Sequence, residues 1–213
     1  MNKIIYENQL KYIESLRNEN DPLIEEMEKF AEENKIPILD KIAADFLEQL
    51  ILIQKPKRVL EIGTAIGYST IRIAKNLKKK ASIDTIEKSL DNIALATDYI
   101  RRSKLESKIN LIEGNALDIL PTLTKKYDLI FLDADKQDYE KLFYYSLILL
   151  KKRGVIFIDN LLWHGYTASS KVPDEYKNST KIIRDFNKLF MSQTSLQKTI
   201  LPIGDGIGLG VKI

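Results

Sequence analysis

The chain has 213 residues, of which 44% are hydrophobic and 30% are charged, and it contains no cysteine and one histidine. This length and composition are typical of one globular domain with a full hydrophobic core. The lack of cysteine excludes disulfides and thiolate metal sites. A single histidine disfavours a zinc site built from nitrogen and sulfur ligands.

The amino-terminal residues lack the apolar core of a signal peptide, and no long uncharged apolar run follows. We therefore expect a cytoplasmic protein without a membrane partner. The net charge of +3 is too small to demand a nucleic-acid partner, although the basic residues are clustered. Such clusters can hold a phosphate backbone, but composition alone favours solvated helix ends and turns. The basic runs are residues 78–80, 101–104, 125–126 and 151–153.

The first part of the chain predicts helices. Asp21 and Pro22 form an N-cap and N1 pair that opens a helix through about residue 34. Residues 40–54 carry apolar side chains at helical spacing. We expect one domain over residues 1–213, with residues 1–56 capping the functional site. The apolar residues of an earlier helix, expected to serve the core or a homodimer contact, are Ile5, Tyr12 and Leu16.

From residue 57 strands and helices alternate, which predicts an α/β, Rossmann-like fold with right-handed crossovers. We expect a mostly parallel seven-stranded sheet with helices on both faces and a carboxy-terminal antiparallel hairpin around residues 202–206. The expected strands are residues 58–62, 82–86, 109–112, 128–132, 155–158, 195–201 and 207–213. The expected helices are residues 68–77, 90–102, 116–123, 139–149 and 174–190.

Two of these apolar strands end in acidic residues. One runs into Asp133, and the other runs into Asp159 and Asn160. Ligands of open α/β sheets bind at the carboxyl ends of the strands, so these side chains and Lys136 are expected to converge. Carboxylate and amide oxygens suit a hard divalent cation such as Mg²⁺. Either aspartate alone could simply cap the following helix, but the doubled pattern favours a metal site.

Residues 61–69 follow the first strand and open the first crossover helix. Gly63 allows a sharp turn, but Thr64 and Ala65 stand where a dinucleotide fingerprint has its second glycine. No Gly-Lys-Ser/Thr sequence follows, so a nucleoside ligand without a bridging diphosphate is favoured. Glu87 ends the second strand, where it could accept hydrogen bonds from two ribose hydroxyls. A tight turn with a solvated glutamate is the alternative for either residue alone.

Taken together, residues 59–69, Glu87, the Asp133-Ala134-Asp135-Lys136 sequence and the Asp159-Asn160 pair resemble the cation-dependent O-methyltransferases. These enzymes use S-adenosylmethionine and include catechol and caffeoyl-CoA O-methyltransferases. The resemblance runs from residues 36–38 to residues 202–206 and implies a class I methyltransferase fold. The length is most similar to the small bacterial branch that includes the tRNA 5-hydroxyuridine methyltransferases.

The resemblance implies a role for each matching residue. Leu117 stands where some relatives place an adenine-bonding glutamine, which leaves the adenine contacts open. Lys136 would be the catalytic general base, and Trp163 would flank the acceptor. The cofactor S-adenosyl-L-methionine would contact Ile38, Glu61, Gly63, Tyr68, Ser69, Glu87, Asn115, Ala116 and Asp133. Mg²⁺ or another divalent cation would be bound by Asp133, Asp159 and Asn160.

The acceptor is expected to carry two neighbouring oxygens. Three protein ligands leave about three positions of an octahedral Mg²⁺ for a chelating acceptor and a water molecule. Together with the resemblance and the basic runs, this favours 5-hydroxyuridine at the tRNA wobble position, which would become 5-methoxyuridine. One alternative is a small catechol-like phenol. A second, of a different class, is a non-catalytic adenosyl-nucleoside-binding module, whereas the absent second glycine disfavours a nicotinamide dehydrogenase.

Overall fold

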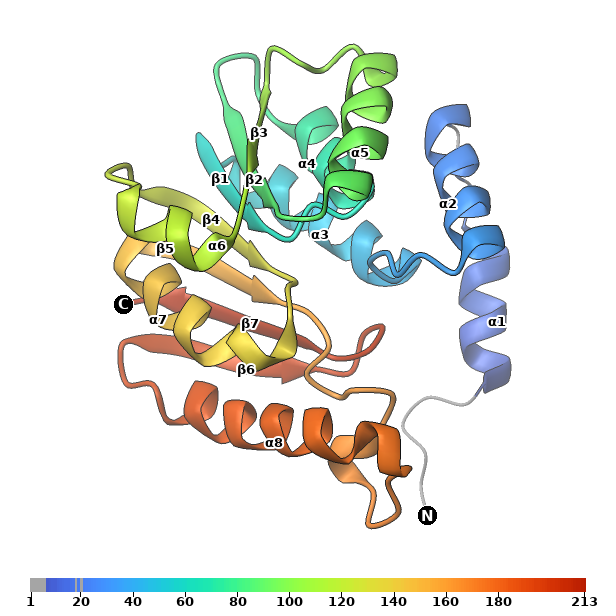
Figure 1. Ribbon diagram of the computed structural model, residues 1–213, viewed down its shortest axis with the longest axis vertical. Helices are drawn as coiled ribbons and strands as arrows, with labels where there is room; N and C mark the ends of the chain where they lie inside the picture. Colours follow the sequence, from blue (N-terminus) through green and yellow to red (C-terminus); the bar gives the residue numbers. More distant parts are fainter. Residues whose placement is uncertain (1–6, 18, 20) are drawn as a thin grey trace. The chain divides into compact units, whose positions relative to one another are not determined.

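The computed structural model describes residues 7–17, 19 and 21–213 (Figure 1). Two compact units are distinguished by their internal contacts, Met1–Pro37 and Ile38–Ile213. In the described part of the chain, no helix is long and apolar enough to cross a lipid bilayer. The fold that positions the candidate site belongs to the larger unit.

The smaller unit contains α1 (Glu7–Leu16) and α2 (Pro22–Asn34). Helix α2 begins as its sequence predicts, because the Asp21 carboxylate accepts the N–H of Leu23 at 2.8 Å. Tyr12 and Leu16 are each 64% exposed, which excludes them from the core. Ile5 lies outside the described residues.

The larger unit contains one seven-stranded sheet in the order β3-β2-β1-β4-β5-β7-β6. Strands β1 to β5 pair in parallel, and β7 pairs antiparallel with both β5 and β6. The predicted fold class is confirmed. The strands are β1 (Arg58–Ile62), β2 (Ser82–Glu87), β3 (Ile109–Glu113), β4 (Tyr127–Leu132), β5 (Leu150–Ile158), β6 (Leu196–Leu201) and β7 (Ile207–Lys212).

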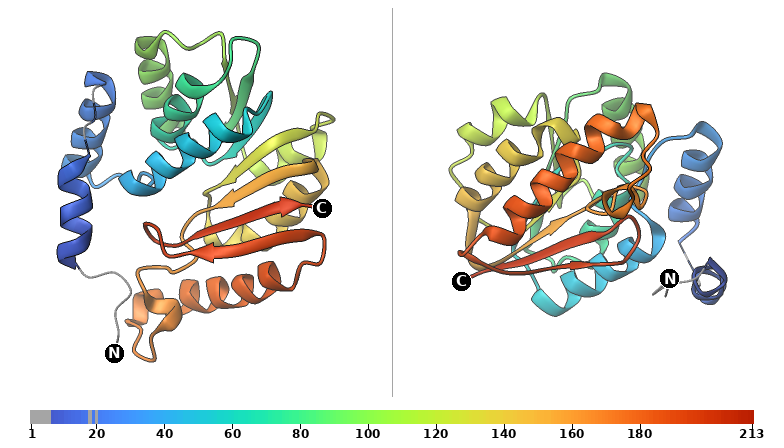
Figure 2. Two further views of the ribbon diagram at one scale, coloured as in Figure 1. Left: turned by 180° about the vertical axis from the view of Figure 1, so that it is seen from behind. Right: turned by 90° about the horizontal axis from the view of Figure 1, so that it is seen from below.

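Helices cover both faces of this sheet (Figure 2). On one face, Ile130 of β4 belongs to a core cluster with Phe143 of α7 and Phe190 of α8. On the other face, Phe157 of β5 packs against Phe46 of α3, with ring centroids 6.1 Å apart. The helices are α3 (Lys41–Gln54), α4 (Tyr68–Asn76), α5 (Leu90–Ser103), α6 (Ala116–Ile119), α7 (Tyr139–Leu149) and α8 (Lys177–Ser192). Short 3₁₀ helices span Leu120–Thr122, Lys136–Asp138, Tyr166–Ala168 and Asp174–Tyr176.

Strand β5 is longer than its sequence predicts. It begins at Leu150 rather than at Val155, and a register shift against β4 accommodates the basic residues 151–153 as a bulge. The apolar run that marked the strand covers only its carboxyl half. The bulge was missed because its charged residues resemble a loop.

Gly63 ends β1 in a conformation that only glycine adopts without strain. Its φ is +102°, and a Cβ built there would lie 1.8 Å from the backbone oxygen of Asp133. The glycine therefore lets the end of β1 pass directly against the end of β4. This close approach brings the loops after the two strands together.

We expect Gly63→Ala to destabilise the protein by more than ~3 kcal/mol, because a backbone atom blocks the new methyl group. Gly165→Ala is the matched control. Gly165 also has a positive φ, of +77°, but nothing lies within 4 Å of its Cβ position. That variant should lose only ~1–2 kcal/mol from left-handed strain. Equal losses for the two variants in urea unfolding would contradict the steric explanation.

Candidate active site

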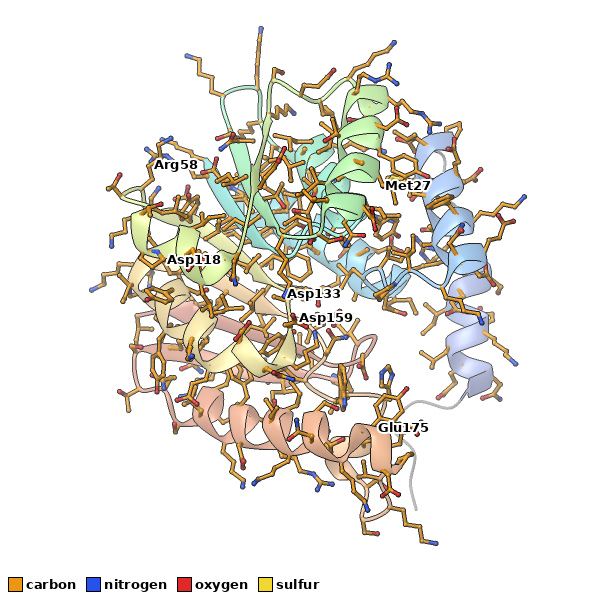
Figure 3. All side chains as sticks on the ribbon, in the orientation of Figure 1. Met27, Arg58, Asp118, Asp133, Asp159 and Glu175 are labelled. Atoms are coloured by element: carbon orange, nitrogen blue, oxygen red, sulfur yellow. The ribbon has the colours of Figure 1, made fainter. Side chains whose placement is uncertain are left out.

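The candidate site lies at the carboxyl ends of β4 and β5. Parallel pairing continues one residue beyond each strand, since Asp133 N–H donates to Ile62 O at 3.0 Å and Asp159 N–H donates to Leu132 O at 3.1 Å. Figure 3 shows Asp133 and Asp159 beside each other at the ends of their strands. The sheet therefore brings the two aspartates together as predicted.

Asp159 is only 3% exposed. Burial raises the pKa of this carboxyl group well above its ordinary value, and the nearby negative charge of Asp133 raises it further. A backbone hydrogen bond from Asn160 N–H, at 2.7 Å, acts in the opposite direction. Two close carboxylates make this a site that favours bound positive charge.

The Lys136 ammonium group occupies the centre of these side chains. It donates to Asp133 Oδ1 at 3.2 Å, to Asn160 Oδ1 at 2.5 Å and to the Tyr139 hydroxyl at 2.7 Å. The Tyr139 hydroxyl in turn donates to the backbone oxygen of Asp159 at 3.1 Å. Lys136, Asp133, Asp159 and Asn160 thus form one connected group. Tyr139 links it to the core but was predicted only as part of a helix face.

The donor set fits a hard divalent cation. Two carboxylates and one amide oxygen are available at Asp133, Asp159 and Asn160, and the Lys136 ammonium already contacts two of these three side chains. No cluster of three or more His, Asp or Glu side chains in the described residues could hold a metal ion alone. Because one of the three candidate ligands is an amide, the two observations are compatible. Water or acceptor oxygens would complete the coordination.

Glu61 forms a buried hydrogen-bond network behind the turn that joins β1 to α4. Its carboxylate accepts Ser69 Oγ at 2.6 Å, Thr85 Oγ1 at 2.6 Å and the hydroxyl of Thr70. Burial raises the pKa of Glu61 to about 7 despite these hydrogen bonds. Thr64 extends the network through a 2.6 Å contact with Thr85. Glu61 is fully buried, so it orients Ser69 and the turn from the interior of the protein.

Glu87 ties the loop after β1 to the loop after β2. Its Oε2 accepts Ala65 N–H at 2.9 Å, and its Oε1 accepts Lys88 N–H and Ser89 N–H, each at 2.9 Å. A carboxylate has about four acceptor positions, so ribose hydroxyls could still bind. The structure therefore adds a loop-holding role to the predicted ribose contact.

Four further residues predicted to contact the cofactor have local positions that the structure defines. The Tyr68 hydroxyl accepts Arg72 Nη1 at 2.8 Å, and the tyrosine is 2% exposed, so its side chain serves the α4 interior. The Asn115 side chain caps α6 by accepting Leu117 N–H at 2.9 Å. Ala116 opens α6, and Ile38 precedes α3 in a half-buried position. The cofactor contacts of these four residues stay predictions.

An aromatic wall stands beside the lysine. The Trp163 ring centroid lies 5.7 Å from Lys136 Nζ, and the indole N–H donates to Ser179 Oγ at 2.9 Å. Two further rings lie 5.0 and 6.4 Å from the Trp163 ring, and a third ring packs against both of these at 6.2 and 5.2 Å. These rings belong to His164, Tyr166 and Tyr176. Such a wall offers stacking surface to a planar acceptor.

Asp205, in the β6–β7 turn, holds the loop that carries this wall. It accepts His164 N–H at 2.5 Å and the Asn160 side-chain amide at 3.4 Å. Asn160, Trp163 and His164 all have left-handed backbone angles, with φ of 65°, 48° and 54°. Asp205 was not predicted as a site residue. Its position between Gly204 and Gly206, both with positive φ, is the sequence signal that could have identified it.

Comparison with known proteins identifies a matching protein family. The family model described as O-methyltransferase matches residues 14–213. A catechol O-methyltransferase from Niastella koreensis is 33% identical, over 99% of this chain and 99% of the relative. A caffeoyl-CoA O-methyltransferase from Populus kitakamiensis is 32% identical, over 77% of this chain and 73% of the relative. The structure of an O-methyltransferase from Bacillus cereus in complex with SAH has a TM-score of 0.83 at 28% identity, covering 95% of this chain and 96% of that one.

The chain belongs to the O-methyltransferase family. The predicted class of enzyme, an O-methyltransferase of the caffeoyl-CoA and catechol type, is confirmed. The roles assigned to single residues, the dependence on a divalent cation and the closeness to tRNA methyltransferases stay predictions.

The raised pKa of Glu61 predicts a pH dependence of stability. The folded state binds the proton more tightly than the unfolded chain, whose pKa is near 4.5. Stability from this group is therefore complete below pH 4.5 and is lost as the pH rises towards 7, by about 3 kcal/mol in total. Glu61→Gln should lack this slope. Parallel curves of unfolding free energy against pH for the two proteins would contradict the assignment.

We expect Asp205→Ala to loosen the aromatic wall, because it removes the acceptor for His164 N–H. Trp163 is the single tryptophan of the chain, so its fluorescence reports on this loop directly. Acrylamide quenching should increase, and unfolding free energy should fall by ~2 kcal/mol. Asp185→Ala is the control, since exposed Asp185 lies on α8 and forms an ion pair with Lys188 of the same helix. Unchanged quenching in Asp205→Ala would show that the turn does not position the wall.

Proposed function

We propose that this enzyme transfers a methyl group from S-adenosylmethionine to one of two neighbouring oxygens of a small phenolic acceptor. The observation that carries the proposal is the position of Lys136 Nζ, which contacts Asp133 and Asn160 and lies 5.7 Å from the Trp163 ring centroid. A proton acceptor, oxygen ligands and a planar wall thus surround one point. Relatives named for catechol and caffeoyl-CoA support an acceptor of this class.

The cofactor is expected in the crevice between the ends of β1 and β2 and the start of α4. The N-cap residue of α4 is Gly67, which has no side chain to cap the helix, so the positive end of the helix dipole can face an anionic group. The carboxylate of the methionine part suits this position, and Glu87 suits the ribose. The SAH bound to the Bacillus cereus relative supports the choice of cofactor.

Asp133, Asp159 and Asn160 would hold a divalent cation such as Mg²⁺. Such a cation, when bound, favours the deprotonated form of a coordinated hydroxyl group. The neutral amine form of Lys136 would take up the proton of the acceptor hydroxyl at Nζ and become the ammonium, and its contacts with Tyr139 and Asn160 would keep that atom in place. Trp163 would fix the plane of the acceptor, so that its oxygen meets the methyl group in line.

The wobble base 5-hydroxyuridine in tRNA is the second candidate acceptor. Its 5-hydroxyl group lies beside the O4 carbonyl, so it offers the same pair of oxygens, and its planar ring could stack on Trp163. The folded chain places one of its basic runs far from the candidate site. Residues 151–153 lie at the amino-terminal end of the sheet, ~17 Å or more from Asp133, because β4 separates the two ends. They cannot grip the phosphates next to a base bound at the site.

The homodimer also stays a proposal, supported by the exposed apolar side chains of α1. Leu10, Ile13 and Leu16 recur at a spacing of three residues and are 38%, 43% and 64% exposed. Sedimentation equilibrium would distinguish a dimer from a monomer, and Leu16→Glu should weaken the dimer.

The acceptor proposal predicts a clear order of activity. With S-adenosylmethionine and Mg²⁺, catechol should be methylated at least 100-fold faster than phenol, because phenol lacks the second oxygen. Excess EDTA should abolish turnover, and Lys136→Ala should lower kcat by ~10²–10⁴ with little change in cofactor affinity. Lys141→Ala, on the exposed side of α7, is the matched control and should keep full activity.

Two results would overturn this proposal. Full activity in EDTA would remove the cation from the mechanism. Methylation of 5-hydroxyuridine tRNA with no turnover of any catechol would move the assignment to the second candidate.

A further inference from the structure

A cavity of about 330 Å³ opens at the amino-terminal end of the parallel strands, away from the candidate active site. Figure 3 labels Arg58, which begins β1 at this end, well apart from Asp133 and Asp159. Five of the residues that line the cavity are basic, one is acidic, and none is aromatic. The lining residues are Gln54, Lys55, Pro56, Lys57, Asp128, Lys151, Lys152, Arg153 and Gly154.

The bulge in β5 forms one wall of the cavity. Between the pairs Tyr127–Leu150 and Leu129–Val155, β4 has one residue where β5 has four. Those four residues present three consecutive basic side chains. Arg153 holds a left-handed φ of 66° within this bulge. The bulge therefore places three basic residues that are consecutive in the sequence along one wall of the cavity.

Asp128 forms the floor and ties the walls together. Its carboxylate accepts Lys57 N–H at 3.0 Å, Arg58 N–H at 2.8 Å and Lys151 Nζ at 2.7 Å. Its backbone oxygen accepts Gln54 Nε2 at 2.6 Å. Although burial acts in the opposite direction, these hydrogen bonds lower the pKa of Asp128. The carboxylate is therefore ionised and fully committed to holding the end of α3, the start of β1 and the bulge.

Four cations remain uncommitted around this floor. Lys55, Lys57, Lys152 and Arg153 are exposed, and their side chains form no ion pair with any described residue. Like charges gathered around one cavity repel each other and create a positive potential that attracts anions. Asp128 neutralises only Lys151. The cavity thus carries an excess of about four positive charges.

We propose that this cavity binds an oligophosphate anion, meaning a ligand with two or more linked phosphate groups. A triphosphate carries three to four negative charges, which match the four free cations, whereas a single phosphate would leave most of them unpaired. The volume is at the lower end of the range for small-ligand sites, which suits a short phosphate chain. The lining has no aromatic ring to stack on a base, so recognition rests on the phosphates. Inorganic triphosphate and the triphosphate of a nucleotide share this chemistry.

The test is calorimetric titration of the full chain with inorganic triphosphate, ATP, orthophosphate and a 12-nucleotide single-stranded RNA. Triphosphate should bind at least tenfold more tightly than orthophosphate and should weaken between 50 and 200 mM salt. Equal affinity for ATP would identify the phosphate chain alone as the ligand. Tighter binding of ATP would identify a nucleotide as the source.

Charge reversal locates the site. The double variant Lys152→Glu, Arg153→Glu should weaken triphosphate binding at least tenfold and leave catechol methylation unchanged. The control Lys141→Glu, Lys181→Glu changes the net charge equally at exposed positions on α7 and α8, and should change binding less than twofold. Thermal unfolding would establish that both variants fold.

Three outcomes would overturn the proposal. The first is no saturable binding of triphosphate. The second is an equal loss of binding in the two double variants, which would show that total charge alone is responsible. The third is RNA binding that is tighter than triphosphate binding and is lost in the Lys152 and Arg153 variant, which would make this a nucleic-acid surface.

Discussion

Repulsion between two carboxylates at neighbouring strand ends shapes the carboxyl edge of the sheet. Parallel pairing of β4 with β5 places Asp133 beside Asp159, and the tight packing around Asp159 keeps water away from it. The Lys136 ammonium is the positive charge that the chain itself supplies, and Tyr139 and Asn160 hold it there. A site of this kind binds cations more readily than neutral ligands. A divalent ion and the sulfonium of S-adenosylmethionine are both of that type.

The hairpin at the end of the chain gives this edge a second support. Its turn passes the site loop closely, since Leu161 N–H donates to Gly206 O at 2.9 Å and Leu162 N–H donates to Asp205 O at 2.8 Å. A Cβ on Gly206 would lie 2.4 Å from Leu162, and one on Gly204 would lie 2.8 Å from Asp40. The glycines thus allow one turn to contact both the loop that carries the aromatic wall and the start of α3. The loop that contains Asn160, Trp163 and His164 has three left-handed residues. Several contacts are needed to hold a loop strained in this way.

Much of the fold could be predicted because buried parallel strands have a strong sequence pattern. The apolar runs before Asp133 and Asp159 predicted two strands of the sheet and, at the ends of these strands, the two acidic residues. What could not be predicted depends on long-range contacts. The Tyr68 hydroxyl takes part in such a contact, because it accepts a hydrogen bond from Arg72, which pairs with residues of α3. Asp205 is 45 residues from Asn160 in sequence, and only the folded hairpin brings the two together.

The sheet separates two regions of opposite charge. Asp128 is the second residue of β4, and Asp133 directly follows the end of the same strand. About 17 Å of strand therefore lies between the basic cavity and the acidic site. This exceeds the screening length of ~8–10 Å at physiological salt, so an anion at one end would barely change the potential at the other. Any coupling between the two ends would have to be mechanical, through the β4 backbone. Asp128 anchors that strand at its start, and Gly63 packs against the residue that follows its end. Because the two sites share no residue, they are expected to bind their ligands independently.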